Sequence, residues 1–216
     1  MQLTHLGHAC LLVELADQRI LVDPGTIDAQ WHGVRDLTAI VITHAHPDHL
    51  DIDRLPALVA QSPGVPVIAD PGSLAALAGT VEAYPHGGDL ASLGSVRITP
   101  VGEVHALIHE DVPRIANVGV RFDAEGEPSL YVPGDNLEGE PGQIDVLAFP
   151  LTAPWQASRH MVAFLRRIAA PVAVPVHDGV ASAAGRAIYL GQAVSLGPDA
   201  TEVRDLAGAG PRIFER

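Results

Sequence analysis

The chain has 216 residues, of which 47% are hydrophobic and only 4% aromatic, so we expect one folded domain over residues 1–216 with a core of Val, Leu, Ile and Ala. The net charge is −13 and no basic run occurs, which argues against a nucleic-acid partner. No stretch approaches the roughly 18 apolar residues of a membrane span, and the N-terminus does not resemble a signal peptide. A cytoplasmic protein without a membrane partner is therefore expected, with its one cysteine, Cys10, as a buried and inert thiol.

Short strands, several of them in hairpins, are predicted to alternate with single helices. We expect strands at 11–15, 19–22, 39–43, 67–69, 80–83, 90–93, 96–101, 118–122, 130–132, 146–149 and 172–176. We expect helices at 53–61, 73–78 (with Ser73 as the N-cap), 158–169 and 181–194, and a polar loop at 102–117. Two sheets packed face to face, with helices outside, fit this order, so the fold class is α/β (α+β).

The most informative stretch follows the apolar strand at 39–43. His44, His46, Asp48 and His49 stand within six residues at the tip of that strand. Imidazole and carboxylate are common ligands of divalent metals, and four ligands facing two ways suit two adjacent ions better than one. Adventitious metal binding by a surface loop is the alternative, and the preceding buried strand and the aspartate weigh against it.

Three later residues share the same context, a metal-capable side chain just past an apolar strand. They are His105, Asp135 and His177. Each alone is more often structural, but with the cluster they supply five imidazoles and two carboxylates, enough for two metals with Asp135 between them. His109 lies in the same loop as His105 and either competes with it or contacts the substrate. The remaining histidines lack this context and are interpreted as surface or supporting residues: His5, His32, His86 and His160.

The order of these residues resembles the metallo-β-lactamase-fold hydrolase superfamily from Leu6 through His177. The segments Leu6-Gly7-His8-Ala9-Cys10 and Leu21-Val22-Asp23-Pro24 resemble its small branch that includes the ascorbate-6-phosphate lactonase-like hydrolases. The resemblance implies a four-layer αββα sandwich with the active site at one edge of the two sheets. It implies one metal at His44, His46 and His105, and a second at Asp48, His49 and His177. It also implies that Asp135 bridges them and that Asp23 supports the histidine loop by hydrogen bonding.

The implied chemistry is hydrolysis of a small molecule. Two divalent ions, most simply Zn²⁺ with Mn²⁺ or iron as alternatives, can share a water and bring its pKa from about 15.7 toward about 7. The hydroxide would attack a small ester, lactone, amide or phosphodiester, with Asp48 orienting the nucleophile or moving its proton. His8 is expected to support the ligands or face the substrate, and Arg114 to meet an anionic substrate group. Trp31 and Trp155 are expected to form an apolar wall or to belong to the core.

Other functions stay open at this point. The nuclease branch of the superfamily adds a second domain and the glyoxalase II-like branch adds C-terminal helices, and the length of this chain favours neither. Histidine and carboxylate also suit iron, so a mononuclear non-haem iron oxygenase is one alternative. A metal-bound sensor or binding module without catalysis is another, and assembly into a homo-oligomer is possible on the sequence alone.

Overall fold

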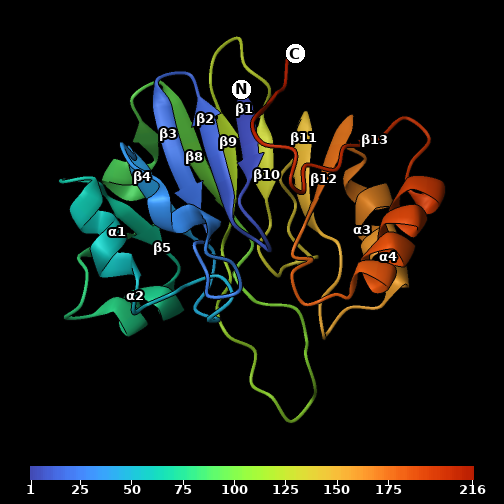
Figure 1. Ribbon diagram of the computed structural model, residues 1–216, viewed down its shortest axis with the longest axis horizontal. Coiled ribbons are helices and arrows are strands. Elements are labelled where there is room, and N and C mark those ends of the chain that lie inside the picture. Colours follow the sequence, from blue (N-terminus) through green and yellow to red (C-terminus); the bar gives the residue numbers. More distant parts are fainter.

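The computed structural model describes residues 1–216 as two seven-stranded sheets packed face to face (Figure 1). Sheet A runs from edge to edge through β14 (Arg212–Ile213), β1 (Gln2–His5), β2 (Leu11–Leu15), β3 (Gln18–Val22), β4 (Ala39–Ile42), β5 (Val67–Ala69) and β6 (Ala83–Pro85). Sheet B runs through β13 (Glu202–Val203), β12 (Val172–Val176), β11 (Val146–Pro150), β10 (Leu130–Val132), β9 (Gly119–Asp123), β8 (Val96–Val101) and β7 (Ser92–Leu93).

Helices cover the outer face of each sheet. Helices α1 (Leu55–Gln61) and α2 (Pro71–Leu77) lie outside sheet A, and α3 (Ser158–Ile168) and α4 (Ala183–Leu196) lie outside sheet B (Figure 1). The predicted αββα sandwich is therefore confirmed. None of these helices has the length and apolarity needed to cross a membrane.

β4 is an example of a strand that is buried on both of its faces. All of its residues are buried, and they alternate between two cores. Ala39 and Val41 belong to the core of 23 buried residues between the sheets, whereas Ile40 and Ile42 pack with Leu55 of α1 in a core of 16. A third core of 12 buried residues lies between sheet B and α3 and α4. A continuous apolar run without polar alternation is what such a strand requires.

Each sheet is antiparallel on one side and parallel on the other. β1, β2 and β3 are antiparallel, and β3 through β6 are parallel. In sheet B, β7 through β10 are antiparallel, and β10 through β13 are parallel. Parallel neighbours end at the same edge of a sheet. The residues after β3, β4, β10 and β12 therefore come together there, which is where ligands bind in many α/β proteins.

Several predicted boundaries are wrong. α2 begins before Ser73, which is not its N-cap: the Asp70 carboxylate accepts hydrogen bonds from the Gly72 and Ser73 amides, and Pro71 takes the first helical position. α4 starts two residues later than expected, because the Ser182 hydroxyl caps it by accepting from the Gly185 amide. α1 starts at Leu55 after a turn in which Asp51 accepts from the Arg54 amide.

The region before β8 also differs from the prediction. The strand expected at 80–83 is β6 at Ala83–Pro85, and the strand expected at 90–93 is shorter: it is β7 at Ser92–Leu93, preceded by a 3₁₀ turn at Gly88–Leu90. The turn follows from Gly87 and Gly88, which both have positive φ. The expected loop at 102–117 is present, and it projects from the edge of the sandwich opposite the two termini (Figure 1).

Candidate metal centre

Seven predicted ligands meet at one edge of the sandwich, at the carboxyl ends of strands from both sheets. The first ligand group consists of His44, His46, His105 and Asp135, and the second consists of Asp48, His49 and His177, with His8 beside them. In each group, one ligand atom from every residue lies within 4.8 Å of all the others. The turn after β4 supplies four of the seven, and the segments after β8, β10 and β12 supply the rest.

Several of these ligand atoms are buried and have no hydrogen-bond partner. They are Nε2 of His44, Nε2 of His49, Nε2 of His177 and Oδ1 of Asp135. Buried polar atoms in proteins are almost always bonded, so unpartnered nitrogen lone pairs beside a carboxylate oxygen indicate a binding site for cations. The residues present therefore fit divalent metal ions.

Hydrogen bonds at Nδ1, the ring nitrogen that points away from the cluster, hold two of the ligand rings with Nε2 facing inward. Nδ1 of His105 lies 2.7 Å from the Ala106 carbonyl oxygen, and Nδ1 of His177 lies 2.8 Å from that of Thr152. Carbonyl oxygens only accept, so both Nδ1 atoms carry a proton and donate it, and in the neutral rings Nε2 presents its lone pair to the ligand cluster. Metal-binding histidines are typically oriented by such a bond on the other ring nitrogen.

Asp23 holds the histidine turn in place. Its carboxylate accepts hydrogen bonds from the Thr43 amide at 2.8 Å, the Thr43 hydroxyl at 2.7 Å and His49 Nδ1 at 2.8 Å. Asp23 is 1% exposed. It lies where the resemblance to known hydrolases places a residue that supports the loop. Gly25 lies two residues after Asp23. A Cβ on it would lie 1.9 Å from the Asp48 carbonyl oxygen, so only glycine lets this segment approach the histidine turn so closely.

Asp135 lies between the two ligand groups. Its Oδ2 is 3.2 Å from His105 Nε2, and its Oδ1 is 3.3 Å from His177 Nε2 and 3.5 Å from His49 Nε2. Each of its two carboxylate oxygens therefore faces a different ligand group. The Asn117 side chain orients the segment by accepting from the Asp135 amide at 2.8 Å. No sequence pattern singled out Asn117, which ends the predicted loop.

The two ligand groups differ in their proton affinity. Burial lowers the pKa of His44 and of His46. Burial also opposes the protonation of His49, but the Asp23 and Asp135 carboxylates outweigh it and raise the pKa of His49 to about 9. The pKa of His177 is raised against burial by Asp135, and the same pairing holds the pKa of Asp135 low. The second ligand group thus stabilises positive charge, which protons or metal cations can provide.

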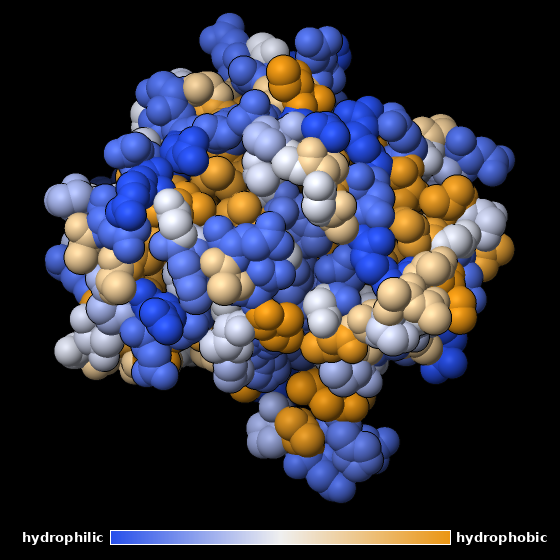
Figure 2. Space-filling model, viewed as in Figure 1, coloured by the Kyte–Doolittle hydropathy of each residue, from blue (hydrophilic) through white to orange (hydrophobic).

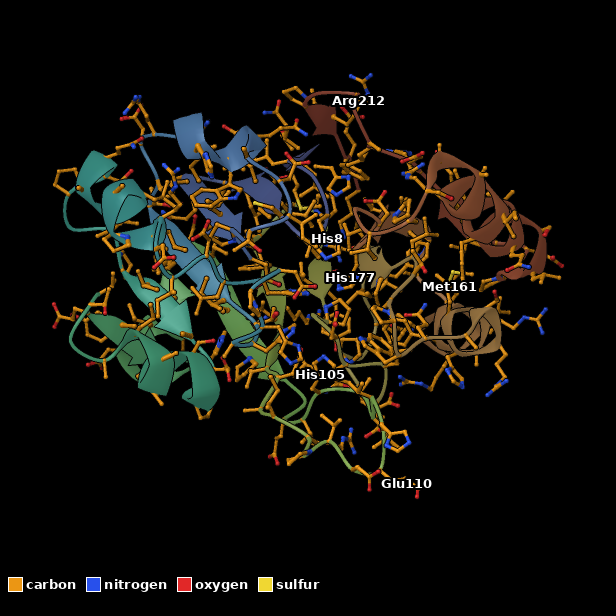
Figure 3. All side chains as sticks on the ribbon, turned by 60° about the horizontal axis from the view of Figure 1, so that its bottom comes forward. His8, His105, Glu110, Met161, His177 and Arg212 are labelled. Carbon is orange, nitrogen blue, oxygen red and sulfur yellow. The ribbon has the colours of Figure 1, made fainter.

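Two of the residues expected near the substrate make other contacts in the structure. Arg114 donates from Nε to the His105 carbonyl oxygen at 2.6 Å, and its guanidinium lies 3.4 Å from a Glu138 carboxylate oxygen. It therefore supports the segment that carries His105, while its Nη1 has no hydrogen-bond partner in the chain. His109 is 66% exposed and pairs with Asp111 on the projecting loop, so it neither joins the ligands nor replaces His105. The neighbouring Glu110 marks the tip of this loop, well away from His105 (Figure 3).

The two tryptophans have different roles. Trp31 is 1% exposed, packs in the core of sheet A and α1, and donates to the Gly25 carbonyl oxygen, so it does not line the site. Trp155 does: its indole N–H donates to Asp135 Oδ2 at 2.9 Å, and its ring centre lies 5.8 Å from that of His105. Among the other histidines, His5 is buried with Nε2 2.7 Å from the His8 carbonyl oxygen.

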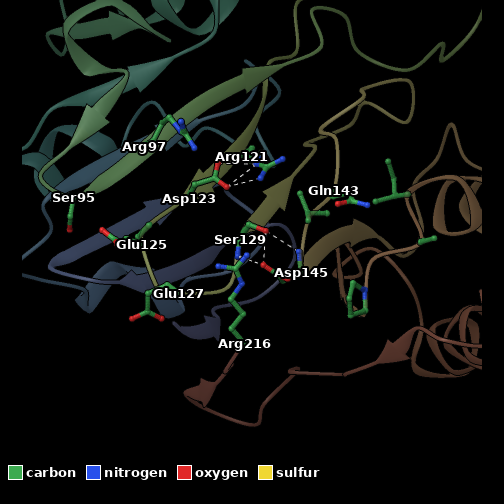
Figure 4. A pocket seen from close by; sticks show the side chains of 15 residues that line it. Ser95, Arg97, Arg121, Asp123, Glu125, Glu127, Ser129, Gln143, Asp145 and Arg216 are labelled. Atoms are coloured by element: carbon green, nitrogen blue, oxygen red, sulfur yellow. Dashed lines mark hydrogen bonds and ion pairs between the residues drawn. The ribbon is translucent and has the colours of Figure 1, made fainter.

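A large cavity lies elsewhere in the molecule. It has a volume of about 1160 Å³ and is lined by side chains that include Arg121, Asp123, Ser129 and Asp145, but by none of the seven ligands (Figure 4). Its polar groups bond to one another: Arg121 pairs with Asp123, and Asp145 accepts from Ser129. The candidate site is therefore the ligand cluster and not this cavity.

Comparison with known proteins agrees with the geometry. A family model described as a β-lactamase superfamily domain matches residues 2–177, the span that contains every proposed ligand. The chain belongs to this superfamily. The predicted family and its metallo-β-lactamase fold are thus confirmed.

Relatives within the superfamily cover most of the chain. Protein Rv0786c of Mycobacterium tuberculosis is 41% identical over 197 residues, which are 91% of this chain and 92% of that protein. A UPF0173 metal-dependent hydrolase of Methanosphaerula palustris is 30% identical over 193 residues, which are 82% and 83% of the two chains. The structure of Igni18, a metallo hydrolase from Ignicoccus hospitalis, has a TM-score of 0.70 at 17% identity over 99% of both chains. The chain is thus similar to proteins named as metal-dependent hydrolases.

Proposed function

We propose that this protein is a hydrolase that uses two divalent metal ions, preferably Zn²⁺, to cleave a small ester, lactone, amide or phosphodiester. The observation that carries the proposal is the position of Asp135, with one carboxylate oxygen toward each group of inward-facing imidazoles. His44, His46 and His105 would hold one ion, and Asp48, His49 and His177 the other, with Asp135 shared. Such a pair, when bound, lowers the pKa of a water between the ions and polarises the scissile group.

Asp48 is the residue best placed to handle the proton of the reaction. Its side chain is 26% exposed, whereas His49, His177 and Asp135 are almost fully buried. Its Oδ2 lies 3.3 Å from His177 Nε2, so it belongs to the second ligand group and still reaches solvent. A carboxylate in this position can accept the proton of the attacking water and pass it to the leaving group.

The surroundings of the ligands favour an uncharged substrate within the proposed range. Arg114 is the one basic side chain that lines the small cavity next to His46 and His105, together with apolar residues that include Ile108 and Val112. Its Nε is already bonded to the His105 carbonyl oxygen. This largely apolar lining beside the first ligand group favours a neutral ester, lactone or amide.

Metal analysis and a substrate panel test the proposal. The protein is purified without added metal and its metal content is measured, then chromogenic esters, lactones, amides and bis-phosphodiesters are assayed with Zn²⁺ and with Mn²⁺. We expect two ions per chain and hydrolysis that falls at least about 100-fold in Asp48→Ala, the usual range for a lost acid–base group. The matched control is Asp53→Ala, whose side chain is exposed.

Three results would contradict the proposal. Full activity in Asp48→Ala would exclude the assigned role of Asp48. One iron per chain together with substrate-dependent oxygen uptake would identify the oxygenase alternative, since the same ligand types bind iron. Two bound ions without hydrolysis of any substrate class would favour a metal-bound sensor.

A further inference from the structure

His8 lies among the ligands of the second group, yet its ring is turned differently from theirs. Its Nε2 is 3.0 Å from Asp48 Oδ2, a distance that by itself fits either a metal ligand or a hydrogen-bond donor. The other ring nitrogen decides between the two. Nδ1 of His8 accepts a hydrogen bond from the Gly179 amide at 3.0 Å.

This contact fixes the tautomer of His8. A backbone N–H can only donate, so Nδ1 must present its lone pair and the proton of the neutral ring must sit on Nε2. His105 and His177 show the reverse arrangement, because their Nδ1 atoms face carbonyl oxygens. Those rings offer a lone pair at Nε2, whereas His8 offers an N–H.

We propose that His8 is a positioning residue that donates from Nε2 to Asp48, and that it is not a metal ligand although it lies within reach of the ligands. The Gly179 amide selects the donor tautomer, and the Nε2–H holds Asp48 Oδ2 in the second ligand group. The inference rests on the proposed function only in taking Asp48 as a metal ligand. His8, which is not one of the seven ligands, would then help to set the affinity for the second metal.

The surroundings of His8 hold its ring rigidly. Its backbone has φ +46, and its carbonyl oxygen accepts from the His177 amide at 2.7 Å, across 169 residues of sequence. The rings of His8 and His177 lie 4.1 Å apart between centres, and Figure 3 shows the two labelled residues next to each other. A Cβ on Gly179 would lie 3.2 Å from His8 Nδ1, so glycine permits the close amide contact. Strained, tightly held residues of this kind are common at functional sites.

Nitrogen NMR of histidine-labelled protein tests the tautomer directly. We expect His8 to show a protonated Nε2 and an unprotonated Nδ1, both in chelator-treated protein and after loading with ¹¹³Cd²⁺. The ligand histidines should instead couple to cadmium through Nε2. Coupling between cadmium and His8, or a proton on its Nδ1, would overturn the proposal.

Two substitutions separate the possible roles of His8. In His8→Asn the amide oxygen can replace Nδ1 as acceptor for Gly179, but nothing reaches Asp48. In His8→Gln the amide N–H₂ can replace Nε2 as donor to Asp48, but the Gly179 contact is lost. Each variant keeps one of the two contacts and removes the other, which makes them a matched pair.

The expected order of metal affinities follows from the donor role. Removing a hydrogen bond to a metal ligand typically weakens binding about 10- to 100-fold, so His8→Asn should weaken the second Zn²⁺ by that factor and His8→Gln by much less. The first Zn²⁺ should be unaffected in both. Equal losses would identify His8 as a ligand, and a larger loss in His8→Gln would show that it only ties the two sheets together. Titration with Zn²⁺ alone gives these numbers, so they stand whether or not any tested substrate is hydrolysed.

Discussion

Replacement of Asp23 by asparagine should weaken binding of the second metal ion while leaving the first unchanged. The Asp23 carboxylate accepts three hydrogen bonds, and the amide of the Asp23→Asn variant would have only one acceptor oxygen for them. If that oxygen faces the Thr43 amide, the N–H₂ group faces His49 Nδ1. The ring must then accept at Nδ1 and carry its proton on Nε2, which is the atom that would bind the metal.

The structure sets the magnitude of this effect. Loss of a partner that orients a metal-binding histidine costs about 10- to 100-fold in affinity, or about 1.4–2.8 kcal/mol. If the amide takes the other orientation, two N–H groups meet at Thr43 in a buried site, and the unfolding free energy should fall by about 1–3 kcal/mol. One orientation therefore lowers the affinity for the second metal, and the other lowers the unfolding free energy. The first ligand group should be unaffected because it has no direct bond to Asp23.

Calorimetric titration of chelator-treated protein with Zn²⁺ measures both sites, and urea unfolding measures the stability. Wild type should bind two ions, and Asp23→Asn one tight and one weakened ion. Asp199→Asn, on an exposed loop, is the matched control. Two ions bound with wild-type affinity, together with unchanged stability, would refute the view that Asp23 selects the His49 tautomer.

Further outcomes follow from the same geometry. Zn²⁺ added to chelator-treated protein at pH 7.5 should release protons into weak buffer, because the pKa of His49 is raised to about 9 and metal binding requires the neutral ring. Because the pKa of His49 is raised from 6.5 to about 9 on folding, its protonation stabilises the folded state fully below pH 6.5, and this stabilisation is lost as the pH rises through 9. Chelator-treated protein should therefore unfold more easily at pH 9 than at pH 6.5, and an unfolding free energy that does not change with pH would contradict this. Trp155→Phe should abolish the fluorescence change on metal binding, since Trp155 bonds Asp135 and Trp31 lies in the core; a retained change would assign it to Trp31. Phe122→Ala, 0% exposed between the sheets, should lower the unfolding free energy by about 3–5 kcal/mol in urea, whereas a loss below about 1 kcal/mol would show that this core relaxes.

The ligands could be predicted from the sequence because each follows a strand that is itself easy to recognise. The apolar run of β4 and the spacing from His44 to His49 are local features, and the carboxyl ends of parallel strands meet regardless of loop details. The supporting contacts could not be predicted in this way. Gly179 acts through a backbone N–H, which every residue except proline has. Thr152 acts through a backbone carbonyl, which every residue has, so neither contact leaves a signal in the sequence.

Residues of one type could not be told apart from the sequence either. Trp31 and Trp155 both lie in loops, and only the tertiary structure places one in the core and the other on Asp135. Arg114 follows His105 closely enough to face a substrate, but its guanidinium turns back to the His105 carbonyl. The choice of Asp70 over Ser73 as helix cap depended on Pro71, whose fixed φ favours the first turn.

The division of the ligands between the two sheets has a consequence for folding kinetics. Sheet A supplies His44 and His46 to the first group and Asp48 and His49 to the second, and sheet B completes both groups. Neither ion can therefore meet its full set of ligands until the two sheets have docked. Contacts that form after the transition state slow unfolding and leave the folding rate nearly unchanged. We therefore expect bound metal to slow unfolding and to leave the folding rate nearly unchanged.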